Sequence, residues 1–548
     1  MLTPFVHILL AINFIYSSPI REKILLAGNF GEPRPNHFHC GIDIKTGGVE
    51  GKCVMATADG FISRITVGLD GFGNALYITH PDGNTSVYCH LKSYAPKIST
   101  LLRKWQYSHE SYIADVRLKP TDCPVVRGQF VGVSGNSGSS QAPHLHFELH
   151  DTRSGKLLDP LNVLMPYIHD TTPPLAHAFM AYPVQDEGIF EGATIKRSYG
   201  FNSHKLSRHF TAWGKVGFGI WANDYTNDTY NKLGVKEIYL KVDGKEVYKS
   251  TVNNFSPTYN RQVNFWGDYE NYFRSGIWYL KSFRTPGNTL PFISTDKNYG
   301  IINFNKEKEY SIEYILKDFN GNTSQYEFIV DAKKVTIPKV HKMEAPSLKR
   351  NVDILTYSYP GVYIVIPQWA LNGNKCLSIK RKAKSNSLNN YYSFYNGLHP
   401  LAIWAEIGLA VRNSVKDPTK LYIASIDGKY YGGKYDNGWI TAPIRELGNA
   451  YGLEYDDQPP TVKPIGSNKW SNNKTIKFAI TDNGSGIKTV KGYIDGQFIL
   501  LERIDKTNTY ICKLQETPLK RNFTERKIEV VATDNKNNKI IISENIVY

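Results

Sequence analysis

The sequence predicts a mainly β protein, in which an N-terminal antiparallel β-sheet domain is followed by β-sandwich domains. Tyr (36 residues) and Phe (25) are abundant whereas Met (5) is scarce, and this bias favours strands over helices. The 44 Gly and 28 Pro residues indicate frequent turns. Because 548 residues are too many for one hydrophobic core, we expect several domains.

Short alternating runs predict the N-terminal antiparallel β domain, which we assign to residues 22–168. Residues 60–67 and 75–80 alternate apolar and polar side chains, as half-buried strands do. Gly71-Phe-Gly-Asn precedes the second run and Pro81-Asp-Gly-Asn follows it, and both segments are typical of tight turns. The domain is therefore expected to consist mainly of strands joined by short turns.

An internal repeat predicts two Ig-like β-sandwiches, at residues 169–340 and 456–548. Each copy has a Pro-Pro pair near its start, an Asp-Gly hairpin signal, and a last strand before an Asn-rich turn. The first copy carries a long insertion with an aromatic stretch, Phe265-Trp-Gly-Asp-Tyr, which fits core packing better than a carbohydrate platform. The matching segments are Asp170-Thr-Thr-Pro-Pro, Ile220-Trp-Ala-Asn-Asp and Tyr314-Ile-Leu-Lys-Asp-Phe-Asn-Gly-Asn in the first copy, and Asp457-Gln-Pro-Pro, Phe478-Ala-Ile-Thr-Asp and Val530-Val-Ala-Thr-Asp-Asn-Lys-Asn-Asn in the second.

A further β-rich domain is expected between the two copies, over residues 341–455. Its clearest strand signals are residues 361–367 and 420–429. Residues 399–411 fit either a strand or a short helix, and the sequence leaves both open.

Residues 1–18 predict a signal peptide. The apolar run from Phe5 to Tyr16 is too short to span a bilayer, and Ser17 and Ser18 offer a cleavage site. A buried N-terminal strand is the alternative. No later segment is long and apolar enough to be a transmembrane segment. We therefore expect an exported protein that is periplasmic or associated with the cell envelope.

The net charge of +15 favours an anionic polymer as partner. Nucleic acid is not expected, because the Lys and Arg residues are scattered and form no continuous basic arm. An acidic cell envelope fits better, and a generally basic, solvated surface is the simpler alternative. The six cysteines form no C-x-x-C pair, which argues against a thiolate zinc site, and both disulfides and buried thiols stay open.

Two short motifs carry the residue types that bind metal ions. His39 and Asp43 are four residues apart, so on a strand both side chains would lie on one face. In the segment Pro143-His-Leu-His-Phe-Glu-Leu, the side chains of His144, His146 and Glu148 share one face of a strand and the apolar residues share the other. A lone histidine is usually a core residue, but together the motifs supply convergent ligands for Zn²⁺ and candidates for a general base.

Two further stretches complete the pattern. Tyr88 and His90 are expected on one strand face within Val87-Tyr-Cys-His-Leu. A glycine-rich segment, residues 128–140, precedes the His-Leu-His motif, and its glycines allow close approach to a substrate chain. A phosphate-binding loop is the competing interpretation, which we discount because the Lys and the following helix are missing.

This ordered set of motifs, over about 130 residues from Phe30, resembles the lysostaphin-type metallopeptidases, also called the LytM-like or duplicated hybrid motif family. The resemblance implies that His39, Asp43 and His146 bind Zn²⁺ and that His90 and His144 are catalytic. Which of these two histidines activates the water and which protonates the amine is left open. The sequence departs from the family in its long segment 91–126, where residues 101–107 resemble a brief helix that would wall the substrate groove.

The resemblance also implies a function: a zinc-dependent endopeptidase that hydrolyses peptide bonds in peptidoglycan stem peptides or cross-links. Endopeptidase action on another extracellular protein is one alternative. A non-catalytic envelope protein that binds or regulates partners through its C-terminal β domains is the other.

Some residues near the motifs carry two interpretations each. Tyr88 either donates a hydrogen bond to the oxyanion or is structural, and Glu148 is either a partner of an imidazole or exposed. His37 is a possible mistaken ligand, but its spacing from Asp43 favours His39. Asn36 also lies close to the metal motif, and we do not assign it as a ligand.

Overall fold

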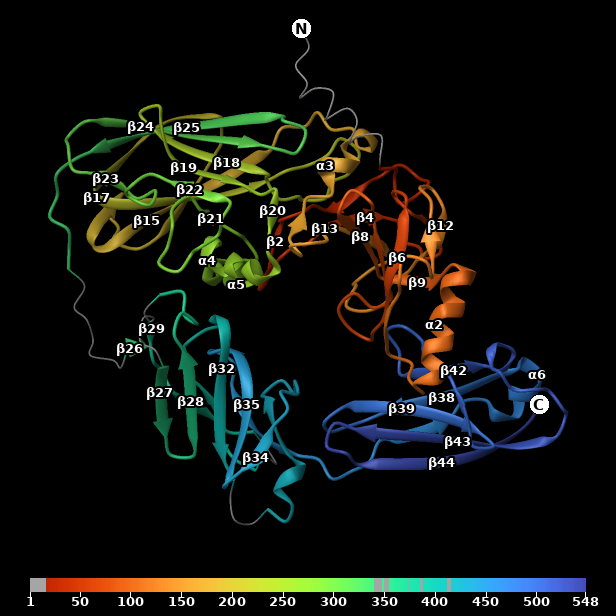
Figure 1. Ribbon diagram of the computed structural model, residues 1–548. Helices are drawn as coiled ribbons and strands as arrows, with labels where there is room; N and C mark the ends of the chain where they lie inside the picture. The colour runs from red at the N-terminus through yellow and green to blue at the C-terminus, as the bar shows by residue number, and fades with distance from the viewer. Residues whose placement is uncertain (1–15, 340–346, 349–353, 374, 385–387, 412–414) are drawn as a thin grey trace, which may run out of the picture.

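The computed structural model describes residues 16–339, 347–348, 354–373, 375–384, 388–411 and 415–548 (Figure 1). Strands predominate in all four regions, as the sequence predicts, and four large hydrophobic cores lie along the chain. Residues 1–15, most of the predicted signal peptide, lie outside the described residues. The described chain begins at Tyr16, whose buried side chain donates a hydrogen bond to Asp82.

A seven-stranded antiparallel path forms the centre of the N-terminal domain, and a three-stranded sheet packs beside it. Alternation along the central strand buries Leu145, Phe147 and Leu149 in the core, and each such burial contributes about 1.5–3 kcal/mol. The large sheet runs in the order β1 (Leu26–Gly28), β4 (Ile42–Lys45), β13 (His144–Asp151), β8 (Asn84–Cys89), β7 (Ala75–Thr79), β6 (Gly60–Val67) and β10 (Ala114–Arg117), and the small sheet in the order β5 (Cys53–Met55), β12 (Phe130–Ser134) and β9 (Leu91–Tyr94).

One helix, α2 (Pro96–Ser108), lies on the outside of this domain and contains the predicted short helix. Its Arg103 forms an ion pair with Glu502 near the C-terminus, with a nitrogen–oxygen distance of 3.0 Å, and a second one with Glu516. Glu110, just beyond the helix, accepts a hydrogen bond from Tyr493. The segment expected to wall a substrate groove therefore connects the first domain to the last one.

The second domain is built on one long, strongly bent sheet (Figure 1). Its insertion contains α4 (Val263–Trp266) and α5 (Tyr269–Ser275), and Phe265 and Trp266 are buried, so this aromatic stretch packs in the core. The sheet runs in the order β16 (Arg197–Gly200), β15 (Leu175–Phe190), β17 (Lys205–Asn223), β25 (Thr323–Ala332), β24 (Glu309–Lys317), β18 (Glu237–Val242), β19 (Lys245–Thr251) and β22 (Ile293–Thr295).

The third and fourth domains each contain two packed sheets. Residues 400–410 form a strand of the third domain, which decides between the two alternatives that the sequence left open. The third domain contains β27 (Ile354–Tyr359), β28 (Val362–Pro367), β32 (Pro400–Ala410), β35 (Trp439–Glu446) and β34 (Lys434–Asp436), packed on β30 (Lys380–Lys382), β31 (Tyr391–Ser393), β36 (Tyr451–Tyr455) and β33 (Leu421–Ser425). The fourth contains β37 (Thr461–Pro464), β38 (Thr475–Thr481), β42 (Thr509–Lys513) and β41 (Glu502–Arg503), packed on β40 (Gln497–Ile499), β39 (Ile487–Ile494), β43 (Glu525–Asp534) and β44 (Lys539–Val547).

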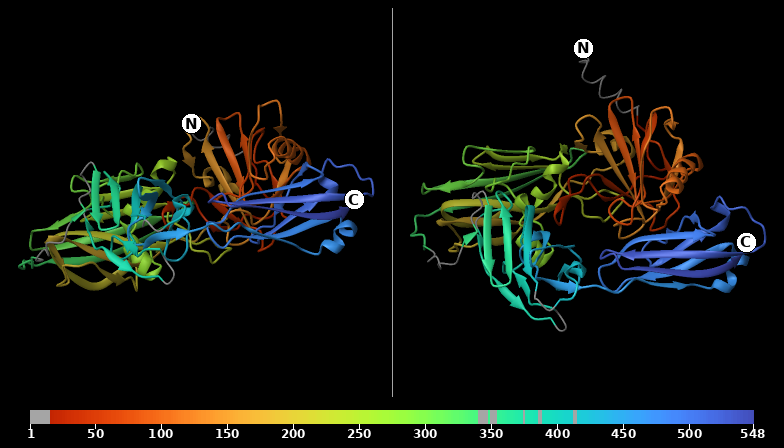
Figure 2. Two further views of the ribbon diagram at one scale, coloured as in Figure 1. Left: turned by 90° about the horizontal axis from the view of Figure 1, so that it is seen from below. Right: turned by 60° about the horizontal axis from the view of Figure 1, so that its bottom comes forward.

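The four domains follow one another around a ring, so the last domain returns to the first (Figure 2). The first and second domains share apolar contacts: Phe30 and Phe38 belong to the core of the second domain, and Leu233 belongs to the core of the first. Within the described residues, no helix is long and apolar enough to cross a membrane. All six cysteines are free thiols in the structure.

Candidate metal centre and active site

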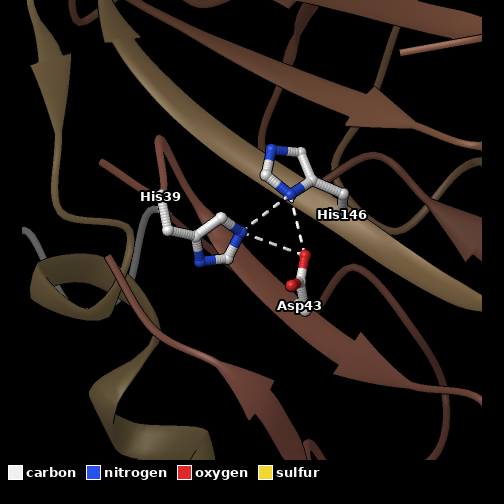
Figure 3. A group of neighbouring side chains, drawn as sticks. All are labelled: His39, Asp43 and His146. Carbon is white, nitrogen blue, oxygen red and sulfur yellow. Dashed lines mark hydrogen bonds and ion pairs between the residues drawn. The ribbon is translucent and has the colours of Figure 1, made fainter. Parts of the chain in front are cut away.

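Three side chains converge at the centre of the large sheet of the first domain (Figure 3). Strands β4 and β13 pair antiparallel with Asp43 directly opposite His146. The Nε2 atom of His39 lies 3.1 Å from Asp43 Oδ1 and 3.0 Å from His146 Nδ1, and the last two atoms are 2.8 Å apart. All three residues are buried. The structure therefore brings together the three ligands that the sequence predicts.

His39 reaches this position from the segment between two strands and not from a strand, which corrects the sequence argument. The hairpin strand β3 (His37–Phe38) ends before it and β4 begins after it, so His39 and Asp43 do not share one strand face. This segment passes directly over β13, where a Cβ atom on Gly41 would lie 2.2 Å from the carbonyl oxygen of Phe147. Glycine is therefore required at position 41 for the motif to close.

Hydrogen bonds fix which nitrogen each ligand histidine presents. The Nδ1–H group of His39 donates to the carbonyl oxygen of Asn29 over 2.8 Å, which leaves Nε2 free to bind a metal. The Nε2–H group of His146 donates to Glu148 Oε1 over 2.9 Å, so Nδ1 is the ring nitrogen that faces Asp43 and His39. Of the two interpretations of Glu148, the structure supports the imidazole partner, because this side chain is buried and also contacts His150.

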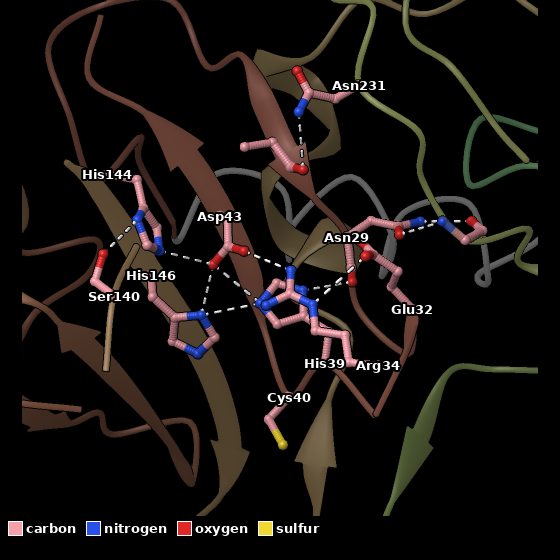
Figure 4. Close-up of polar contacts among 12 residues, drawn as sticks. Asn29, Glu32, Arg34, His39, Cys40, Asp43, Ser140, His144, His146 and Asn231 are labelled. Carbon is pink, nitrogen blue, oxygen red and sulfur yellow. Dashed lines mark hydrogen bonds and ion pairs between the residues drawn. The ribbon is translucent and has the colours of Figure 1, made fainter. Parts of the chain in front are cut away.

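Asp43 is surrounded by positively charged or protonatable groups (Figure 4). Arg34 donates from Nη2 to Asp43 Oδ2 over 2.6 Å, while Oδ1 faces His39, His146 and His144. Burial would raise the pKa of Asp43, but the histidine charge and the hydrogen bonds hold it well below its usual range. Sequence reasoning did not identify Arg34, and no pattern in the sequence marks it.

The charges also set the protonation of the ligands. Burial lowers the pKa of His39 to about 4, so its imidazole is neutral at pH 7. Burial opposes protonation of His146, but the hydrogen bonds and charges of Asp43 and Glu148 outweigh it and raise the pKa to about 9. Burial likewise opposes ionisation of Glu148, and the hydrogen bonds from His146 and His150 nevertheless lower its pKa to about 2.

Two further histidines lie beside the cluster. The ring centroid of His90 is 5.0 Å from that of His144 and 5.8 Å from that of His146. His90 donates from Nδ1 to the carbonyl oxygen of Ser137, and His144 donates from Nδ1 to that of Ala142, each over 2.8 Å. Both histidines therefore present Nε2, and that of His144 lies 3.2 Å from Asp43 Oδ1. Burial, followed by the neighbouring histidine charges, lowers the pKa of His90 to about 3.

Tyr88 does not face the cluster, contrary to the expectation that it shares a face with His90. Its hydroxyl is fully buried and bonds to Thr57 and Ser86 on the core side of the sheet. The alternation fails because β8 ends at Cys89 and His90 adopts a positive φ of 59°, which turns its side chain to the other face. Tyr88 is therefore structural.

Two other residues near the motif form hydrogen bonds with groups outside the cluster. His37 is exposed, and its Nδ1 bonds to the carbonyl oxygen of Pro35. The side chain of Asn36 accepts hydrogen bonds from Arg261 and Asn264 of the second domain. Both findings agree with leaving these residues out of the ligand set.

Phe72 lies at the rim of the site, and sequence reasoning missed it. Its ring stacks on that of His146, with centroids 5.9 Å apart, although 37% of the residue is exposed. The glycine-rich segment holds this turn closely, since a Cβ atom on Gly138 would lie 2.3 Å from the amide nitrogen of Gly73. An aromatic residue between two glycines was the sequence signal available for a side chain placed to contact a ligand.

Two family models match parts of the chain. The model described as peptidase family M23 matches residues 37–107, which include His39, Asp43 and His90. The chain carries a peptidase family M23 domain. The predicted resemblance to lysostaphin-type peptidases is thereby confirmed. A second model, described as a Zu5-like domain, matches residues 352–456.

Curated relatives match about a quarter of the chain. A protein of Haemophilus influenzae described as an uncharacterized metalloprotease is 28% identical over 136 residues, which are 25% of this chain and 22% of the relative. The DD-carboxypeptidase/endopeptidase Mpg of Neisseria meningitidis is 29% identical over 141 residues, 26% of this chain and 25% of the relative. The chain thus spans about a quarter of the length of these relatives.

Solved structures also match about a quarter of the chain. The catalytic domain of lysostaphin from Staphylococcus simulans is 25% identical, with 26% of this chain and 91% of that chain covered and a TM-score of 0.19. A zinc-containing peptidase from Vibrio cholerae is 23% identical, with 26% and 39% covered and a TM-score of 0.20.

Proposed function

We propose that the protein is a zinc-dependent endopeptidase that hydrolyses peptide bonds in the stem peptides or cross-links of peptidoglycan. One observation carries this proposal. Five side chains meet at the centre of the M23 domain. His39, Asp43 and His146 form a triangle of three donor atoms, and two further histidines present Nε2 beside this triangle.

The donor set fits zinc. Two imidazole nitrogens and one carboxylate oxygen are ligands that zinc takes in catalytic sites, where three protein groups leave one position open. Distances of 2.8–3.1 Å between the donor atoms place all three within reach of one ion. Each histidine ligand donates its other ring nitrogen to a carbonyl or carboxylate, as metal-bound histidines almost always do. We therefore assign His39, Asp43 and His146 as the zinc ligands.

Zinc, when bound, would supply positive charge that polarises a carbonyl group and lowers the pKa of a nearby water molecule. The chain's own residues do the proton transfers. His90 and His144 each hold a backbone carbonyl with Nδ1, so Nε2 of one accepts the proton of the attacking water. Nε2 of the other donates a proton to the departing amine. Glu148 and Asn29 keep the two ligand imidazoles oriented throughout.

The substrate assignment rests on the relatives and on charge. The Neisseria relative is described as a DD-carboxypeptidase/endopeptidase, and bonds between D-amino acids are a feature of peptidoglycan peptides. The net charge of +15 favours binding to a partly anionic polymer. Action on peptidoglycan requires a protein exported to the periplasm or the cell envelope, as the apolar N-terminal run predicts.

The test uses the full-length protein and purified peptidoglycan. The protein is incubated with and without 1,10-phenanthroline, then with zinc restored, and released fragments are identified by mass spectrometry. We expect new amine and carboxyl ends at one peptide bond, lost with the chelator and regained with zinc. If the zinc-loaded protein leaves peptidoglycan intact but cleaves a soluble extracellular protein, the substrate is an extracellular protein and not peptidoglycan. Cleavage of neither would reject the enzyme.

A further inference from the structure

Three buried aspartates converge at a second place in the molecule, about where the first and second domains join. Asp170 precedes β15, Asp224 follows β17, and Asp318 follows β24. One carboxylate oxygen from each lies within 4.8 Å of the other two, and all three residues are at most 5% exposed. Oxygen atoms that bind one calcium ion at about 2.4 Å are at most about 4.8 Å apart, so one ion could contact all three.

Asp224 has no partner for its charge. It is 0% exposed, and neither of its carboxylate oxygens accepts a hydrogen bond; Oδ2 of Asp170 lacks a partner too. None of the ion pairs among the described residues involves any of the three aspartates. A buried carboxylate without a counter-charge is strongly destabilising. Burial, and then the two neighbouring carboxylates, raise the pKa of Asp224 to about 9.

Hydrogen bonds hold the framework of this cluster in place. Asn322 donates from its backbone and from its side chain to the two oxygens of Asp318. The same side chain, together with that of Asn320, donates to the backbone carbonyl oxygen of Asp170. The turn after β24 therefore fixes two of the aspartates in advance, and their remaining oxygen lone pairs stay available.

The internal repeat builds the same framework a second time, at Asp456, Asp482 and Asp534. Asn538 donates to the carbonyl oxygen of Asp456 and to both oxygens of Asp534, as Asn322 does in the first copy. One position differs. Asp482 is partly exposed and accepts hydrogen bonds from the backbone of Gly484 and Gly486, whereas its counterpart Asp224 accepts none. The repeat thus keeps the geometry, and only the first copy leaves a buried carboxylate unsatisfied.

We propose that Asp170, Asp224 and Asp318 bind one calcium ion. The donors are all oxygen atoms, which hard cations prefer, whereas zinc and other transition metals favour nitrogen and sulfur. Calcium accepts irregular sets of six to eight oxygens, so carboxylates from three separate segments suit it better than they suit magnesium, which demands regular octahedral geometry. The cation would supply the positive charge that Asp224 lacks.

This ion would tie down a loop that supports the peptidase site. The backbone groups of Asp224 and Leu233 exchange two hydrogen bonds of 2.9 Å, which close the loop of residues 225–232. Leu233 is buried in the core of the first domain, and Gly234 exchanges two hydrogen bonds of 2.7 Å with the side chain of Asn29. The carbonyl oxygen of Asn29 in turn orients His39. Calcium therefore binds at the start of the loop whose contact with Asn29 helps to orient the zinc ligand His39.

The test compares the full-length protein with its Asp224→Asn variant. Both are freed of divalent cations on a chelating resin, reloaded with one equivalent of zinc, and titrated with calcium chloride by calorimetry. We expect the variant to have one calcium site fewer than the unmodified protein. At a calcium concentration 100 times Kd, the Tm of the unmodified protein should rise by roughly 5–10 °C and that of the variant should not.

In cation-free buffer, the order of the two Tm values should be reversed or the difference should vanish. Because Asp224→Asn removes a buried carboxyl group that has neither a counter-charge nor a hydrogen-bond partner, its Tm without calcium should equal or exceed that of the unmodified protein, which a merely damaged fold would not show. Asp331→Asn, in the exposed group with His209 and Glu309 of the same domain, is the matched control and should keep the calcium response. Three results would each overturn the calcium site. They are an equal number of calcium sites in Asp224→Asn, no calcium binding by the unmodified protein at millimolar concentration, and tighter binding of magnesium or manganese at this position.

Discussion

Asp43 and Asp224 are both buried aspartates at the centre of a group of possible ligands, yet their surroundings are opposite. Asp43 has a guanidinium on one oxygen and three imidazoles around the other. Asp224 has two further carboxylates and no cation. Accordingly, the pKa of Asp43 is held well below its usual range and that of Asp224 is raised.

The proposed zinc and calcium sites thus differ in the charge and the donor type that the fold places around a carboxylate. At Asp43 the protein supplies nitrogen donors and has already balanced the negative charge, which suits a zinc ion that must also leave a position open for substrate. At Asp224 it supplies oxygen donors and leaves the charge unbalanced, which suits a hard cation that is bound for structure. Loss of zinc from the first site should therefore leave calcium binding at the second site intact.

The largest expected effect comes from removing a nitrogen donor. His146→Ala should lose bound zinc, measured by inductively coupled plasma mass spectrometry, and should lower kcat/KM by about 10³-fold or more, because several kcal/mol of transition-state stabilisation depend on the metal. The rise of Tm with calcium should persist. His37→Ala is the matched control, since that side chain is exposed and lies outside the cluster. A zinc content unchanged in His146→Ala would end the ligand assignment.

A smaller effect is expected from the two histidines beside the triangle. His90→Ala and His144→Ala should each lower kcat by about 10²–10⁴-fold, the usual contribution of general acid–base catalysis, while one equivalent of zinc stays bound. Comparing zinc content with kcat separates them from the ligands. If either variant loses zinc as His146→Ala does, that histidine belongs to the ligand set and the division of roles is wrong.

The parts of the site that follow from strand alternation were predictable. Along β13, the period of two places His144, His146 and Glu148 on one face and apolar residues on the core face, and the antiparallel pairing with β4 then sets Asp43 opposite His146. These relations depend only on alternation within a strand and on the register between two paired strands, so they can be predicted from the sequence.

Relations that depend on a turn or on a distant segment were not predictable. His90 reaches the site through a positive φ, which no alternation rule anticipates, and Tyr88 consequently faces the core. The contact between Asn29 and Gly234 joins residues 205 positions apart. Likewise, the aspartates of the internal repeat are visible in the sequence, but their convergence depends on how β17 and β24 are placed in the folded sheet.

An intermediate effect is expected at Glu148, which supports a ligand without touching the metal. Glu148→Gln keeps the shape of the side chain but removes the charge that holds the Nε2–H group of His146. Zinc affinity, measured by competition with a chelating dye, should fall about 10–100-fold, as for other residues that orient metal ligands. At saturating zinc, kcat should return to near the original value. A kcat that stays low at saturating zinc would indicate that Glu148 takes part in the chemistry.

The smallest effect is expected where the two sites meet, at Asn29. Asn29→Ala removes both hydrogen bonds to Gly234, so unfolding in urea should become easier by roughly 2 kcal/mol, at about 1 kcal/mol for each bond. The carbonyl oxygen that orients His39 remains, but without its anchor in the second domain zinc affinity should fall a few-fold. Asn231→Ala is the matched control, because it removes a single, longer hydrogen bond of 3.4 Å between the same loop and β1. If Asn29→Ala lowers stability and leaves zinc affinity unchanged, β1 alone positions the carbonyl oxygen, and the loop that begins at Asp224 only holds the two domains together.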